Sequence, residues 1–170
     1  KQVSDSHTPD STPPTLTAFK LDMDAGSMTF TFNEAVKASK FVTAELRLQK
    51  VANSDSVHVP LVAKSQPVTN DDEITVDLTD AVMHTIKLKQ LCRSHNECFL
   101  TISANGATDM NLIPVNEHSA AGALELKENM YVPDTTGPEL SKFTFNVNTG
   151  EMKLTFTEPV SKDTFDARAV

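Results

Sequence analysis

Two cysteines and a histidine lie close together in this sequence, and their residue types suit either a covalent crosslink or a metal site. Cys92, His95 and Cys98 fall within one short stretch, LCRSHNECFL. Two neighbouring thiols can form a local disulfide that closes a small loop. A structural zinc site would need four ligands, and His84 would have to supply the fourth. The residues alone therefore leave three alternatives: a disulfide, a metal site or free buried thiols.

Side chains that could catalyse a reaction are present, but their arrangement does not indicate an enzyme. The chain has five histidines and 23 acidic residues. It has no serine nucleophile motif, no glycine-rich phosphate loop and no HExxH zinc motif. A pair of carboxylates can be chosen from so many acids in many ways, so such a pair does not indicate glycoside hydrolysis. The sequence predicts no catalytic residues and no enzymatic activity.

The composition favours a folded domain and disfavours two kinds of partner. Hydrophobic residues make up 39% of the 170 residues, which is enough for a core. The net charge of −8 argues against nucleic acid and anionic membrane surfaces, because both need clustered lysine and arginine. No apolar run approaches the roughly 18 residues of a membrane-spanning helix. We expect no nucleic-acid partner and no membrane insertion.

An internal repeat organises the elements that must position these residues. Two segments, 9–41 and 133–165, align without a gap at an offset of 124 residues, as from Asp10 to Asp134. A repeat of this length has the size of a domain and can enclose its own core. We predict a leading linker at residues 1–9, a first domain at 10–132 and the N-terminal part of a second domain at 133–170. The identical pairs include Asp10/Asp134, Leu16/Leu140, Phe19/Phe143, Gly26/Gly150, Met28/Met152, Phe32/Phe156 and Glu34/Glu158.

Alternating hydrophobic residues predict strands along most of the first domain. The clearest run is 27–34, where Met28, Phe30 and Phe32 share one face. Gly26, just before it, is typical of a hairpin turn. Further strands are expected at residues 19–23, 42–49, 57–63, 73–78, 98–104 and 123–131, and in the second copy at 143–147 and 152–156.

One short helix is expected at residues 81–91, with Thr79 or Asp80 as its cap. About seven short strands and one helix predict an all-β protein with an Ig-like Greek-key β-sandwich, followed by an incomplete second copy. It is not a true immunoglobulin domain, because the chain has no Trp and its two cysteines are only six positions apart. They cannot form the long-range bridge between the sheets.

Two motifs resemble those of bacterial-type Ig-like repeats, which occur in tandem in large secreted and surface proteins of bacteria and some protists. The first is P-x-L-x-x-F followed by G-x-M-x-F-x-F-x-E-x-V, at residues 14–36. The second is FLTISANGATDMNLIPV at residues 99–115, where Asp109 and Pro114 match that family's Asp-x-x-Gly-Asn-Pro turn. Residues 111–113 depart from the expected Gly-Asn, so this turn must differ. The resemblance covers nearly all of residues 10–132 and then residues 134–170.

The resemblance implies an extracellular structural protein rather than a catalyst. Domains of that family act as spacers, stalks and adhesive or fibre-forming modules, and they share no catalytic residues. In such a secreted chain we expect Cys92 and Cys98 to form a disulfide. The alternative function is a binding module that recognises a carbohydrate or protein ligand through the loops at one end of the sandwich. A carbohydrate-binding face normally has aromatic platforms, and this chain has no Trp and one Tyr.

The second copy predicts an apolar face that would serve for assembly. Its 37 residues from 134 to 170 suffice for about two strands and the start of a third, which cannot bury that face. Either a continuation of the chain or strands from a neighbouring copy would cover it, and head-to-tail donation between copies would build a fibre. The expected partner is thus the protein itself. The predicted face consists of Phe143, Phe145, Met152, Leu154 and Phe156.

Acidic side chains near the domain ends could bind calcium and so stiffen a joint between domains. Oxygen ligands of this kind suit calcium, and a solvated acidic surface is the alternative. No other cofactor is expected. The candidates are Asp10, Glu34, Asp134 and the acidic run at 70–73.

The segment before the first strand is rich in Ser, Thr and Pro, a composition that favours attached O-linked glycans. The alternative is an unmodified extended segment that leads into the first strand. The candidate acceptor residues are Thr8, Ser11, Thr12 and Thr15.

Overall fold

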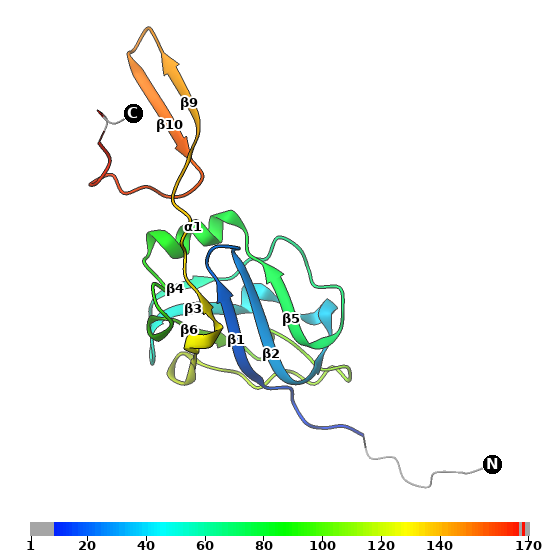
Figure 1. Cartoon of the computed structure of the whole chain (residues 1–170). Coiled ribbons are helices and arrows are strands. Elements are labelled where there is room, and N and C mark those ends of the chain that lie inside the picture. The colour runs from blue at the N-terminus through cyan, green and yellow to red at the C-terminus, as the bar shows by residue number, and fades with distance from the viewer. Residues whose placement is uncertain (1–8, 167, 169–170) are drawn as a thin grey trace, which may run out of the picture.

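The computed structural model describes residues 9–166 and 168, and these residues are mostly β-structure (Figure 1). The elements are β1 (Leu16–Asp22), β2 (Ser27–Val36), β3 (Leu46–Val51), β4 (Ser54–Pro60), β5 (Asp71–Asp77), α1 (Asp80–Leu88), β6 (Phe99–Ile102), β7 (Leu124–Glu125), β8 (Tyr131–Val132), β9 (Leu140–Asn146) and β10 (Glu151–Phe156). One four-stranded sheet has the order β5-β2-β1-β8, and another has the order β4-β3-β6-β7. The two sheets form the layers of a β-sandwich, and β9 and β10 form a separate hairpin.

The β1–β2 hairpin shows why alternating residues form strands here. The two strands are antiparallel, and Phe19 lies opposite Phe30 with both side chains buried. Gly26 turns the chain with a φ of +67°, which glycine adopts without steric cost. In the same turn, Asp22 Oδ1 accepts a hydrogen bond from the Ala25 N–H at 2.8 Å. The predicted hairpin is confirmed.

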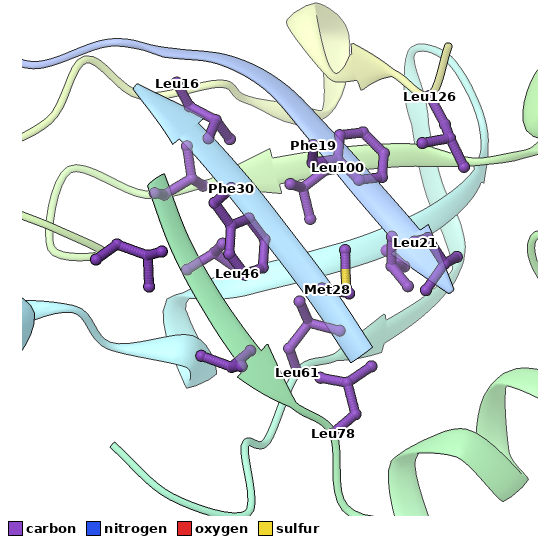
Figure 2. Close-up of a cluster of buried hydrophobic side chains, with 14 of the residues drawn as sticks. Leu16, Phe19, Leu21, Met28, Phe30, Leu46, Leu61, Leu78, Leu100 and Leu126 are labelled. Carbon is purple, nitrogen blue, oxygen red and sulfur yellow. The ribbon is translucent and has the colours of Figure 1, made fainter. Parts of the chain in front are cut away.

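The hydrophobic core lies between the two sheets (Figure 2). Phe30 of β2 and Leu46 of β3 come from opposite sheets, and both are fully buried. Phe41, from the connection between these strands, packs its ring against Phe30 with the centroids 5.2 Å apart. Because each such buried side chain contributes roughly 1.5–3 kcal/mol, this cluster is the main source of the sandwich's stability.

The helix α1 confirms the predicted helix, although it ends earlier than residue 91. Thr79 is its N-cap residue, but the Thr79 side chain makes no capping hydrogen bond. The helix ends because Gln90 has a φ of +53°, and the Leu91 N–H then closes the turn on Ile86 O at 3.0 Å. Leu91 is buried although it lies beyond the end of the helix. Its hydrophobic side chain continued the helical spacing in the sequence, and the prediction therefore extended the helix too far. No helix among the described residues is long and apolar enough to span a membrane.

Three predicted strands are shorter than the sequence pattern indicated, and the predicted strand 98–104 is reduced to β6 at Phe99–Ile102. Within 42–49, Thr43–Glu45 is a 3-10 helix, so β3 begins only after it. Within 123–131, only β7 pairs with β6, and Glu128–Met130 forms a 3-10 helix before β8. The physical reason is that residues 127–129, Lys-Glu-Asn, offer no apolar side chain to bury on the face of a sheet.

The β9–β10 hairpin repeats the pairing of the β1–β2 hairpin. Phe143 lies opposite Leu154, just as Phe19 lies opposite Phe30 at the positions 124 residues earlier. The turn glycine of the second hairpin, Gly150, also has a φ of +67°. The repeat in sequence is therefore also a repeat in backbone conformation.

Side-chain contacts repeat between the two hairpins as well. The Ser141 hydroxyl donates to Thr155 O at 2.9 Å, and the Thr17 hydroxyl donates to Thr31 O at 3.0 Å. These four residues are equivalent across the offset of 124. The ring pairs Phe32/Phe41 and Phe156/Phe165 likewise both have centroids 6.3 Å apart.

Candidate functional site

A lysine of α1 joins the first unit (residues 10–132) to the second unit (133–166). Lys87 Nζ lies 2.9 Å from Asp134 Oδ2 and 2.6 Å from Glu158 Oε1. Burial alone would lower the pKa of Lys87, but its hydrogen bonds to Glu158 and Asp134 outweigh this and raise the pKa above its ordinary value. Lys87 therefore stays charged, and one ammonium group binds two carboxylates of the second unit.

The β1–β2 turn makes a second contact across this joint. Asp24 Oδ1 accepts hydrogen bonds from the backbone N–H groups of Thr135 at 2.8 Å and Thr136 at 3.1 Å. Asp24 Oδ2 accepts one from the Thr135 hydroxyl at 2.6 Å. These bonds, the Thr135 hydroxyl first among them, lower the pKa of Asp24 to about 2. Charge-assisted hydrogen bonds thus fix the start of the second unit on the first.

The predicted assembly face lies on the β9–β10 hairpin and contacts water. Phe143 is 64% exposed, whereas its counterpart Phe19 is 1% exposed. Met152 is 54% exposed, whereas its counterpart Met28 is 1% exposed. Large exposed apolar patches are uncommon on folded domains, which makes this face a candidate interaction surface. The other predicted members are Phe145, which is exposed, and Leu154 and Phe156, which are half-buried.

The disulfide predicted between Cys92 and Cys98 is present, with a distance of 1.99 Å between the sulfur atoms. Both cysteines are fully buried, and the bond links the end of α1 to the start of β6. The zinc alternative is wrong, because both thiols are consumed by the bond. Closing so short a loop stabilises the fold by about 2 kcal/mol in the chain-entropy account. The Tyr131 hydroxyl donates to Cys92 O at 2.7 Å, so this loop also positions β8.

The predicted glycosylation residues differ in how accessible their hydroxyl groups are. Thr8 lies outside the described residues. Ser11 and Thr12 are exposed. Thr15 is half-buried, and its hydroxyl oxygen accepts a hydrogen bond from Asn116 Nδ2 at 2.8 Å. Ser11 and Thr12 are therefore the more accessible of the described acceptor hydroxyls.

The structure separates the acidic residues that the sequence grouped as candidate calcium ligands. Asp10 and Glu34 come together, and Asp109 joins them, with one ligand atom of each lying within 4.8 Å of the others. Asp134 lies instead at the joint, and the run 70–73 belongs to neither group. The leading segment of the described chain, residues 9–15, lies at the end of the sandwich opposite to α1 and the joint (Figure 1).

Comparisons with known proteins add no relative from which a function could be transferred. The chain matches no protein-family model, no curated protein and no solved structure. Any functional interpretation therefore has to come from the structure of this chain.

Sequence reasoning missed three residues that the structure places at these sites. Lys87 and Asp24 were not identified as joint residues, and Asp109 was not grouped with Asp10 and Glu34. The repeat keeps an Asp and a Glu at the positions of Asp10 and Glu34 in both units, but this pattern by itself identifies none of the three residues.

Proposed function

We propose that the protein is a structural module of an extracellular stalk or fibre, in which Ig-like sandwiches follow one another along the chain. The strand order supports an Ig-like topology, since β1, β2 and β5 share one sheet while β3, β6 and β7 share the other. The disulfide supports an oxidising and hence extracellular location.

The parallel pairing of β1 with β8 is the observation that carries this proposal. Leu21 pairs with Tyr131 and Asp22 with Val132, and the Met23 N–H donates to Val132 O at 2.9 Å. The chain enters β1 at one end of the sandwich and leaves β8 at the other (Figure 1). A pull on both ends therefore shears these strands, which loads their hydrogen bonds together instead of one after another. A spacer that bears force needs this geometry.

The joint supports a stiff connection between successive units. Lys87 and Asp24 contact the second unit from two different elements, so the joint is fixed at more than one point. Only Pro133 and a few residues separate β8 from these contacts, and proline restricts the backbone of Val132 before it. Such a joint transmits force along the chain with little bending.

The apolar face of β9–β10 supports a second sandwich. In the first unit the same face of β1–β2 packs against the sheet that contains β3 and β6. A sheet of the same kind covers β9–β10, and its strands belong either to the same polypeptide or to a neighbouring copy. In the second case, copies that join head to tail build a fibre.

Single-molecule pulling tests this function. We expect the chain held at residues 9 and 132 to unfold in one cooperative event, at a force well above that for the same chain held at residues 9 and 37. The second geometry pulls β1 from β2 at their shared end, so the hydrogen bonds break one at a time. Equal unfolding forces in the two geometries would argue against a force-bearing spacer.

Light scattering of the 170-residue chain separates the two sources of the covering strands. Serial oligomers that survive dilution would favour donation by a neighbouring copy. A monomer would favour strands from the same polypeptide.

A further inference from the structure

Three carboxylates meet where the leading segment joins the sandwich. Asp10 comes from that segment, Glu34 from the last part of β2, and Asp109 from the loop after β6. One oxygen of each lies within 4.8 Å of the other two. Asp10 is exposed and Glu34 half-buried, while Asp109 is only 2% exposed. The cluster therefore has a buried floor and an open side.

Asp109 is held in place but is only partly satisfied. Its Oδ1 accepts hydrogen bonds from the backbone N–H groups of Asn111 at 2.9 Å and Ile113 at 2.6 Å. Its Oδ2 is buried and has no hydrogen-bond partner among the described residues. A buried carboxylate oxygen without a partner is costly, and native proteins rarely leave one so. We therefore expect this oxygen to bind a group that is not part of the described residues.

The negative charge of the cluster favours binding of a cation. The ion pairs among the described residues involve Lys64 and Lys87, and neither lysine pairs with these three carboxylates. Burial raises the pKa of Glu34, and the charges of Asp10 and Asp109 raise it further. Mutual repulsion of this kind is relieved when a positive ion lies between the oxygens.

The second unit provides an internal comparison for this position. Its counterparts of Asp10 and Glu34 are Asp134 and Glu158, and these two bind the ammonium group of Lys87. In the second unit, the Asp–Glu pair of this repeat therefore binds a positively charged group, the ammonium group of Lys87. In the first unit a third carboxylate adds to the pair, which favours a divalent ion over a single ammonium group.

We propose that Asp10, Glu34 and Asp109 bind one calcium ion, which fastens the leading segment to the sandwich. The ligand set consists of carboxylate oxygens alone, which suits a hard cation and not zinc. Calcium holds its oxygen ligands at about 2.3–2.6 Å, so two on opposite sides of the ion lie about 4.8 Å apart, and the three oxygens fall within that span. Water can fill the open side. The inference stands apart from the proposed function, since a spacer can work with or without this ion.

A calcium titration of the full chain tests the site. Isothermal calorimetry should show one calcium ion bound per chain, and NMR should show the amide signals of Asn111 and Ile113 shifting with the same saturation. Glu34→Gln and Asp10→Asn should each weaken binding by about tenfold or more. Both side chains lie outside the hydrophobic core, so these variants should remain folded. Asp109→Asn is not used, because Asp109 is buried and its replacement could also destabilise the fold.

Asp72→Asn is the matched control, because it removes an exposed acid of β5 that is not in the cluster. It should bind calcium as the unmodified chain does. The proposal is overturned if millimolar calcium does not bind saturably, or if Glu34→Gln and Asp10→Asn bind as tightly as the control. It is also overturned if calcium shifts only signals at the joint and leaves Asn111 and Ile113 unmoved.

Discussion

Lys87 holds the second unit on the first, because its ammonium group lies between two carboxylates. Lys87→Met keeps the apolar stem and removes the charge, which leaves Asp134 and Glu158 facing each other. We expect the joint to lose about 1–2 kcal/mol, since the pair is only partly buried. Hydrogen exchange of the Thr135 and Thr136 amides, which bond across the joint, should accelerate by roughly 5–30-fold.

Lys64→Met provides the comparison for this prediction. Lys64 forms an ion pair with Asp80 at 3.0 Å, and both side chains are largely exposed. Exposed pairs contribute little to stability, so exchange at Thr135 and Thr136 should not change. An equal acceleration in both variants would mean that the joint does not depend on Lys87.

The contact of Asp24 with Thr135 should be lost at low pH, when the Asp24 carboxylate becomes protonated. Because folding lowers the pKa of Asp24 from 3.8 to about 2, the contact's contribution is complete above pH 3.8 and is lost as the pH falls through about 2. An NMR titration should therefore give a midpoint near 2 for the Thr135 amide. Thr135→Ala removes the hydroxyl that lowers this pKa most and should raise the Asp24 midpoint. A Thr135 midpoint near 3.8 in the unmodified chain would show that the contact is absent.

At this scale the sequence predicts local partners better than distant ones. The bond between Cys92 and Cys98 joins two thiols only six positions apart, so the sequence already indicated this pair. Lys87 sits within the predicted helix, but its partners belong to the other unit. Only the orientation of the two units brings them to it, and no local pattern encodes that orientation.

The turn glycines test whether both hairpins use the same backbone conformation. Gly26 and Gly150 each have a φ of +67°, which costs an alanine about 1–2 kcal/mol. Gly26→Ala should lower the free energy of unfolding of the first unit by this amount in urea. An added Cβ would lie 3.4 Å from Met83 Cγ, an ordinary contact, so the backbone is the cause.

Gly150→Ala is the matched variant, because a Cβ at Gly150 would meet no atom within 4 Å. It should leave the unfolding of the first unit unchanged and increase hydrogen exchange in β9 and β10. A Gly26→Ala variant as stable as its parent would mean that the turn does not take the left-handed conformation.

Strands with strict alternation could be predicted well, and those without it could not. β2 and β10 follow their hydrophobic pattern because each presents one apolar face. The stretch 123–131 misled the prediction, since Leu124 and Leu126 begin an alternation that the polar residues after them do not continue. Its last part returns to the other sheet as β8, which depends on long-range pairing with β1.

For the whole molecule, the repeat predicted the order of the units but not how they meet. The ungapped match between residues 9–41 and 133–165 indicated a second unit, and the hairpin geometry agrees with that match. The acidic cluster could not be assembled from sequence in the same way. Asp109 is distant from Asp10 and Glu34 along the chain, and only the packing of both sheets brings the three together.

The central claim is that the apolar face of β9–β10 is covered by a second sheet in the assembled protein. Methionine oxidation by peroxide, followed by mass spectrometry, measures this directly, because exposed methionines oxidise faster than buried ones. In the isolated chain, Met152 should oxidise as fast as Met110, which is 48% exposed, and Met28 should be protected. In the assembled protein, Met152 should become as protected as Met28. A Met152 that still oxidises as fast as Met110 in the assembled protein would contradict the account.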